Sequence, residues 1–149
     1  MASSRTRGHK VDVDGGERLA YSGMEFVIRA SAESTGGVLS VVEEINGVDT
    51  PTHVHAKEDE LFYVLEGEHV FTIDGVEHHA GPGDAVFGPR GVPHAQRRVV
   101  PRTGRTLAMF TPAGFEEFFR DLAGAEGTGS IGRQTLEQLG EKYAVTWLT

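Results

Sequence analysis

The sequence predicts an all-β fold of roughly eight to ten short antiparallel strands, followed by one or two short helices. Three observations favour this fold class. First, 20 glycines and 6 prolines stand between short apolar runs, which is typical of β domains with many turns. Second, Asp74-Gly75 joins two apolar runs, a strong signal for a hairpin with a type I′ turn. Third, helical spacing of apolar residues is found only towards the carboxyl end.

The predicted strands are short runs of β-branched, aromatic and aliphatic residues that end at turn residues. In chain order they are Met24–Ala30, Gly37–Ile45, Thr52–His55, Glu60–Leu65, His69–Ile73, Val76–His79, Ala85–Phe87, Ala95–Val100 and Thr106–Thr111. The run Glu60–Leu65 is rich in aromatic and aliphatic residues, so we expect it to be buried. Pro89–Pro93 is expected to form a stiff loop.

The carboxyl end is predicted to be helical. In the segment Pro112–Ala123, apolar residues recur at helical spacing, and Thr111 can cap the helix with Pro112 in its first turn. These apolar residues are Phe115, Phe118, Phe119 and Leu122. We expect the phenylalanines to serve helix packing, with a lid over a substrate as the alternative. After a predicted flexible linker over Gly124–Gly132, a second helix is expected over Thr135–Lys142, capped by Thr135, before an apolar end.

Composition excludes several classes of function. The formal net charge of −8 and the pI of about 5.3 disfavour nucleic acid as a partner, because its binding needs a basic surface. The sequence has no cysteine, so disulfides and thiolate ligands are excluded. The start, Met1–Lys10, lacks the apolar run of a signal peptide, and no stretch approaches the roughly 20 apolar residues of a membrane span. We therefore expect a cytoplasmic protein that binds no membrane.

Three histidines and one glutamate form a candidate metal site. His53 and His55 alternate along a strand and therefore share one face. Glu60 begins the next strand, and His94 follows the Pro89–Pro93 loop. Imidazole suits Fe, Ni, Cu or Zn, and a carboxylate helps to hold Mn, Fe or Ni. Four ligands on one side of a six-coordinate ion would leave up to two positions for substrate, water or dioxygen.

Other polar residues near this set are not expected to bind the metal. Glu58 and Asp59 are interpreted as a solvated turn. The remaining histidines stand at no recognisable ligand spacing; we expect His69, His78 and His79 to be surface or cross-strand residues, and His9 to lie in a mobile arm.

Two motifs in this chain resemble those of the cupin superfamily. The first, Gly-(x)5-His-x-His-(x)4-Glu-(x)6-Gly, is matched in full from Gly47 through Gly67. The second, Gly-(x)5-Pro-x-Gly-(x)2-His-(x)3-Asn, is matched from Gly83 to His94, but Arg98 stands where asparagine is usual. The resemblance implies a cupin double-stranded β-helix, a jelly-roll barrel with the metal inside it. It implies that His53, His55, Glu60 and His94 are the ligands.

Longer segments resemble small bacterial quercetin dioxygenase-like cupins, namely residues 58–67, 81–94 and 111–119. Some similar small cupins act as polyketide cyclases or isomerases instead. Small cupins also resemble one another in pairing through sheet edges and exchanged terminal strands, so we expect a homodimer. The resulting division of the chain is a mobile arm over 1–18, a cupin barrel over 19–111 and a helical extension over 112–149.

The leading functional hypothesis is a metal-dependent dioxygenase that acts on a small aromatic or enolic compound, such as a flavonol or related phenolic. It would carry one divalent transition metal per chain, drawn from Fe, Mn, Ni, Co, Cu and Zn. Glu60 would be both a ligand and the general base for the substrate hydroxyl. Phe62 and Gln96 share the ligand face of their strands and are the candidate substrate-binding residues, although Phe62 suits ordinary barrel packing equally well.

Two alternatives stay open. The first is a non-oxidative polyketide cyclase or isomerase that uses the metal as a Lewis acid, which anaerobic turnover would distinguish. The second is a non-enzymatic sensor of a small molecule or metal, which a tightly bound and chemically unchanged ligand would support. The arm before the first strand is too short and glycine-rich for a DNA-binding helix-turn-helix unit.

Overall fold

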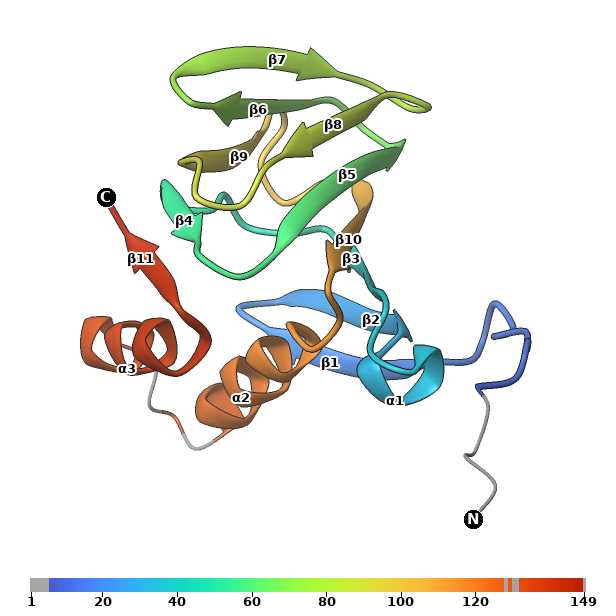
Figure 1. Cartoon of the computed structure of the whole chain (residues 1–149). Helices are drawn as coiled ribbons and strands as arrows, with labels where there is room; N and C mark the ends of the chain where they lie inside the picture. The colour runs from blue at the N-terminus through green and yellow to red at the C-terminus, as the bar shows by residue number, and fades with distance from the viewer. Residues whose placement is uncertain (1–5, 128, 130–131, 149) are drawn as a thin grey trace.

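The computed structural model describes residues 6–127, 129 and 132–148. It consists of two antiparallel sheets, with the helices at the lower end of the molecule, level with β1 and β2, in the view of Figure 1. The strands are β1 (Glu17–Tyr21), β2 (Met24–Ala30), β3 (Ser40–Ile45), β4 (His53–His55), β5 (Asp59–Glu66), β6 (His69–Ile73), β7 (Val76–Ala80), β8 (Ala85–Gly88), β9 (His94–Arg98), β10 (Arg105–Thr111) and β11 (Val145–Trp147). The helices are α1 (Ala32–Thr35), α2 (Glu116–Gly127) and α3 (Arg133–Tyr143).

The two sheets interleave strands that are distant in the sequence. One sheet has the order β1-β2-β3-β10-β5-β8, and the other has the order β11-β4-β9-β6-β7. Strand β10 therefore lies between β3 and β5, while β9 lies between β4 and β6. All of these pairs are antiparallel, and the connections cross between the sheets as in a jelly roll. The predicted all-β jelly-roll class with short C-terminal helices is confirmed.

Strand alternation determines which residues face the inside of the barrel. On β5 the buried positions are Glu60, Phe62 and Val64, with less buried residues between them. On β9 the buried positions alternate in the same way, so that histidine, glutamine and arginine point inwards. The barrel interior is therefore apolar along much of its length but carries polar side chains at defined levels.

The hairpin predicted at Asp74-Gly75 is confirmed. Strands β6 and β7 pair from His69↔Ala80 to Ile73↔Val76, which leaves a two-residue loop. Asp74 has φ 51° and Gly75 has φ 79°, as a type I′ turn requires at both central positions.

The amino-terminal boundary was predicted wrongly. Strand β1 begins at Glu17, inside the segment expected to be a mobile arm, and it pairs with β2. The guanidinium of Arg29 donates hydrogen bonds to the carbonyls of Asp12, Val13 and Gly15, which ties the preceding residues to the same sheet. A polar, aperiodic sequence does not show this anchoring, because backbone carbonyls accept hydrogen bonds whatever side chains they carry.

The first C-terminal helix also differs from its predicted bounds. Thr111 is the last residue of β10, and α2 begins at Glu116, so Thr111 is not its cap. The buried carboxylate of Glu116 accepts hydrogen bonds from the backbone N–H of Ala32 and of Gly114, at 2.6 and 2.9 Å, and from the hydroxyl of Ser40. These contacts anchor the start of α2 to α1 and β3. The helix runs through Gly127, into the predicted linker; residues 128, 130 and 131 of that linker lie outside the described residues.

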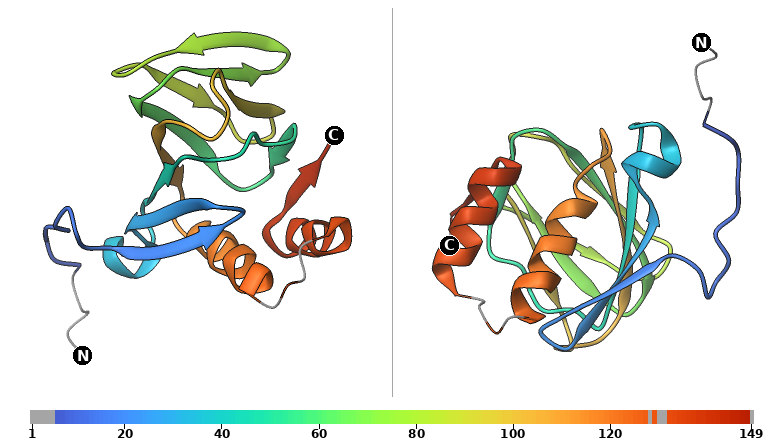
Figure 2. Two further views of the ribbon diagram at one scale, coloured as in Figure 1. Left: turned by 180° about the vertical axis from the view of Figure 1, so that it is seen from behind. Right: turned by 90° about the horizontal axis from the view of Figure 1, so that it is seen from below.

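The second helix, α3, begins at Arg133 rather than Thr135, with Gly132 as its cap residue. The apolar end that follows is strand β11, which pairs with β4. Viewed from below, α2 and α3 lie next to each other across the barrel (Figure 2). The indole Nε1 of Trp147 on β11 donates a hydrogen bond to the carbonyl of Leu136 on α3 at 2.8 Å. Within the described parts of the chain, the helices are too short or too polar to cross a bilayer.

Candidate metal centre

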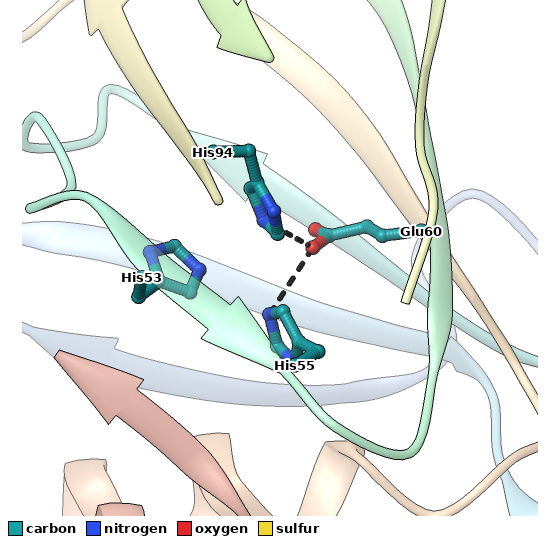
Figure 3. Close-up of side chains that lie close together, drawn as sticks. All are labelled: His53, His55, Glu60 and His94. Atoms are coloured by element: carbon teal, nitrogen blue, oxygen red, sulfur yellow. Dashed lines mark hydrogen bonds and ion pairs between the residues drawn. The ribbon is translucent and has the colours of Figure 1, made fainter. Parts of the chain in front are cut away.

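The barrel brings the four predicted ligand residues together from three strands. His53 and His55 share the inner face of β4, and the register of β4 on β9 places His94 directly opposite His53. Glu60 reaches the same point from β5 in the other sheet. All four residues are buried, and one potential ligand atom from each lies within 4.8 Å of the others (Figure 3).

The glutamate lies between two of the imidazoles. Its Oε1 is 3.1 Å from Nε2 of His94 and 3.4 Å from Nε2 of His55, as the dashed lines in Figure 3 indicate. The ring centroids of His53 and His94 are 4.4 Å apart, and those of His55 and His94 are 5.2 Å apart. The side chains therefore converge on one small volume.

Each of the three histidines of the cluster has an oxygen acceptor next to Nδ1, the ring nitrogen that points away from the centre of the cluster. Nδ1 of His53 lies 2.7 Å from the carbonyl of Pro51, Nδ1 of His55 lies 3.3 Å from Oε1 of Glu58, and Nδ1 of His94 lies 3.4 Å from the carbonyl of Val92. When Nδ1 donates to such an acceptor, Nε2 carries the lone pair that a metal needs.

Protonation within the cluster follows from burial and from these contacts. Burial, assisted by His94 and His55, lowers the pKa of His53 to about 4. Burial also opposes protonation of His55, but hydrogen bonds with Glu58 and Glu60 outweigh it and raise the pKa to about 9. Burial would raise the pKa of Glu60, yet the hydrogen bonds from His55 and His94 lower it to about 2. Glu60 is thus ionised at neutral pH, and a metal ion would have to displace the proton that His55 shares with it.

The donor set fits a divalent transition metal. Three imidazole nitrogens and one carboxylate suit first-row metals from Mn to Zn, and the oriented Nδ1 contacts are typical of histidines that ligate. Because the four residues are buried, placing a charged ion among them costs desolvation free energy. Coordination by the four side chains would offset this cost.

Glu58 was predicted to be solvated, and this was wrong. Its side chain is 10% exposed and contacts His55 at 3.3 Å, so it is a buried partner of a candidate ligand histidine. The chain turns after β4, and this turn folds Glu58 back under the imidazole. A carboxylate three residues after a candidate ligand was the available sequence signal. Asp59, in contrast, pairs with Arg90 near the surface.

Replacing Glu58 with glutamine is expected to weaken metal binding by about 10- to 100-fold, because the amide orients His55 less firmly and lowers its basicity as a ligand. Competition against a chelator of known affinity would measure the change. Asp59→Asn is the matched control, since Asp59 contacts Arg90 instead of a histidine. An unchanged affinity in Glu58→Gln would show that this carboxylate has no influence on the site.

A cavity of about 270 Å³ adjoins the cluster. Phe62 and Gln96, the predicted substrate-binding residues, both line it, and the ring of Phe62 lies 5.7 Å from that of His94. Much of the remaining wall is apolar and aromatic, and it comes from β2, β10, α2, α3 and β11. Its aromatic residues include Phe26, Phe110, Phe115, Phe118, Phe119 and Trp147.

The C-terminal phenylalanines pack against one another, as predicted, and the predicted alternative of a substrate lid stays a prediction. They pack in one aromatic cluster, with ring centroids of Phe115 and Phe118 4.9 Å apart, and they also line the cavity. The ring of Phe115 lies 4.6 Å from that of His55. Trp147, which the sequence did not mark, lies 5.3 Å from the ring of His53 because β11 pairs with β4.

The other histidines stand apart from the cluster. His78 and His79 are exposed on β7, as predicted. His69 is not a surface residue: it is 1% exposed, and its Nε2 lies 3.1 Å from the carbonyl of Glu66. Its Nδ1 lies 3.4 Å from the amide of Gln96. His69 points inwards from β6, which pairs with β9 in the barrel wall. The strand is short and flanked by polar residues, so the alternation of its side chains did not show which of its faces lies inside the barrel.

Comparison with known proteins agrees with this geometry. The family model for the cupin domain matches residues 41–110, which contain all four cluster residues. Quercetin 2,3-dioxygenase from Bacillus subtilis is 33% identical over 109 residues, covering 72% of this chain and 32% of that protein. Dimethylsulfoniopropionate lyase DddQ from Ruegeria pomeroyi is 44% identical over 52 residues, covering 34% of this chain and 25% of that protein. The chain thus spans about a third or less of the length of these relatives.

Among solved structures, an RmlC-like cupin from Shewanella frigidimarina superposes with a TM-score of 0.59 at 24% identity, over 74% of this chain and 96% of the other. This likeness concerns the fold alone. The jelly-roll barrel, the domain match and the buried His-His-Glu-His cluster together show that the chain belongs to the cupin superfamily.

Proposed function

We propose that this chain is a metal-dependent enzyme for a small aromatic or enolic compound, and that the reaction is a dioxygenation. The observation that carries the proposal is the position of the His53, His55, Glu60 and His94 cluster in the wall of a cavity with an aromatic lining. An apolar pocket with a few convergent polar groups is the usual form of a site for a small organic ligand. The 33% identity to a quercetin 2,3-dioxygenase supports this substrate class.

The proposed roles follow from the contacts. The three histidines and Glu60 would hold the ion through Nε2 and carboxylate oxygens. When bound, a divalent transition metal supplies Lewis-acid stabilisation of an ionised substrate oxygen and, in an oxygenase, reactivity towards dioxygen. Glu60 is the proposed proton acceptor for the substrate hydroxyl. The pKa of Glu60 is low because His55 and His94 donate hydrogen bonds to its carboxylate. Histidines that bind a metal lose the protons that make these hydrogen bonds, so this lowering of the pKa would not persist in the metal-loaded site.

The aromatic wall would position the substrate and exclude water. Phe62 offers a ring face next to His94, and Gln96 offers an amide that can hydrogen-bond an oxygen of the substrate. Phe115 and Trp147 close the cavity on the side of the helices and β11. Exclusion of water strengthens the electrostatic effect of the cluster on a developing negative charge.

The first test combines metal analysis with oxygen uptake. Protein purified without added metal is expected to contain close to one divalent transition-metal ion per chain, as the single cluster within the described residues implies. In air, the loaded protein is expected to consume oxygen in proportion to the loss of a flavonol such as quercetin, and to show no turnover without oxygen. Flavonol loss at equal rates with and without oxygen would contradict a dioxygenase.

A non-oxidative reaction is the second candidate. The 44% identity to a lyase over 52 residues favours it, and a polyketide cyclase or isomerase would use the same ion as a Lewis acid. Turnover in the absence of oxygen would support this candidate. A ligand that binds tightly and is recovered unchanged would support the sensor hypothesis instead. The homodimer and the cytoplasmic location stay predictions from the sequence.

A further inference from the structure

A second carboxylate, Glu44, lines the cavity away from the metal cluster. It stands on the inner face of β3, where it pairs with Thr106 of β10, whereas Glu60 pairs with Phe110 of the same strand. Thr106 and Phe110 are four residues apart, which corresponds to roughly 13 Å along a strand. Between these two levels the inner face carries Phe62 and its partner Ala108. On these strands the cavity therefore has a carboxylate at each of two levels and apolar residues between them, while the amide of Gln96 lines it from β9 on the opposite sheet.

Glu44 is held by Arg98, the residue that departs from the usual second cupin motif. Nη2 of Arg98 lies 3.5 Å from Oε2 of Glu44, and the hydroxyl of Thr106 donates to the same oxygen at 3.5 Å. No described residue donates a hydrogen bond to Oε1. A carboxylate that is only 8% exposed thus keeps one oxygen available on the cavity side.

Arg98 is itself fixed in place. Its Nη1 donates to the carbonyl of Val48, and its backbone N–H donates to Oδ1 of Asp49 at 2.9 Å. A Cβ at position 47 would collide with the guanidinium, so Gly47 leaves the space that the arginine fills. Within the described residues, Arg98 Nε is the buried side-chain polar atom without a hydrogen-bond partner. The arginine is tolerated there because it balances the charge of Glu44.

The electrostatics indicate which ligand group suits Glu44. Burial raises the pKa of Glu44 to about 7, although Arg98 opposes this shift. A cationic ligand would gain little, because the guanidinium already balances the carboxylate and would repel a second positive charge. In its ionised form, which predominates above a pH of about 7, Glu44 can accept a hydrogen bond from a neutral hydroxyl at Oε1 without any added charge. Such a hydrogen bond to a carboxylate is stronger than one between neutral groups.

We propose that Glu44, oriented by Arg98, determines specificity by accepting a hydrogen bond from a substrate hydroxyl remote from the metal-binding end. The preferred substrates are thus compounds with a metal-binding oxygen at one end, an apolar ring system in the middle and a further hydroxyl at the other end. This inference rests on the proposed function, because it assumes that the substrate's first oxygen lies at the cluster.

Binding of matched ligands tests the proposal. The probes are 3-hydroxyflavone, which has one hydroxyl next to its carbonyl, and analogues that each carry one extra hydroxyl on a different ring carbon. Calorimetric titration of the metal-loaded full chain, without oxygen so that no turnover occurs, gives each affinity. The parent is expected to bind at least one analogue about tenfold more tightly than 3-hydroxyflavone, as one charge-assisted hydrogen bond implies.

The informative variant is Glu44→Gln. Arg98 and Thr106 both contact the same oxygen of Glu44, so the amide oxygen would take that place and the NH₂ would face the cavity. An acceptor would thus become a donor with little change of shape, and the preference for the extra hydroxyl is expected to fall to within about twofold. Affinity for 3-hydroxyflavone itself is expected to stay the same.

Glu43→Gln is the matched control. Glu43 is the next residue of β3, but its carboxylate contacts Arg29 and Arg105, and it does not line the cavity. This variant is expected to keep the tenfold preference. If the parent shows no preference among the probes, or if the preference survives in Glu44→Gln, the inference is overturned while binding of 3-hydroxyflavone still supports the proposed function. If no flavonol binds, the proposed substrate class fails and the inference falls with it.

Discussion

Replacing His94 with alanine is expected to remove most of the bound metal while the two sheets persist. His94 contacts Glu60 at 3.1 Å and lies directly opposite His53, so its loss leaves a gap at the centre of the cluster. The same result is expected for His55→Ala. Elemental analysis of purified variants gives the metal content per chain, and circular dichroism checks that the β structure is retained. Full metal retention in a His53→Ala/His55→Ala double variant would falsify the ligand assignment.

The histidines outside the cluster provide the controls. His78 is exposed, so His78→Ala is expected to leave the metal content unchanged. The free energy of unfolding is expected to change by less than about 0.5 kcal/mol. His69→Ala is expected to keep the metal but to lower the free energy of unfolding by about 1–3 kcal/mol, because the carbonyl of Glu66 and the amide of Gln96 lose a buried partner. A loss of metal in either variant as large as that in His94→Ala would place the site elsewhere.

Replacing Glu60 with glutamine is expected to keep a substantial share of the metal but to lower turnover per bound ion by at least about a hundredfold. The amide oxygen can still coordinate, whereas an amide is not a useful base at neutral pH. General-base assistance contributes typically about 10²–10⁴-fold. Within the described residues, Glu60 is the carboxylate of the cluster, whereas Glu58 contacts the outer nitrogen of His55.

The measurement must be made per metal ion, on the substrate that oxygen uptake identifies. Asp59→Asn serves as the control, because Asp59 is adjacent in the sequence but pairs with Arg90 outside the cluster. Turnover per ion in Glu60→Gln that stays within a few-fold of the parent would mean that Glu60 is only a ligand. The base would then have to be sought elsewhere in the barrel.

The sequence alone determined the fold class and the residues of the candidate metal centre. Alternation along short strands reports which side chains share a face, and the spacing His53-x-His55 therefore places two imidazoles together without any knowledge of the sheet. The Asp74-Gly75 turn was equally local, because its positive φ angles are a property of the two residues. The bounds of the helices do not follow from local sequence, since the start of α2 depends on contacts of Glu116 with α1 and β3.

Only the tertiary structure decided which buried polar groups meet. Glu58 folds back under His55, His69 turns to the inside beside Gln96, and Trp147 reaches the cluster through the pairing of β11 with β4. The pairing of Glu44 with Arg98 joins two sheets and depends on the register of each strand. A side chain's burial and charge balance come from neighbours far away in the sequence. Local patterns report the face of a strand, but they do not report what lies across the barrel from it.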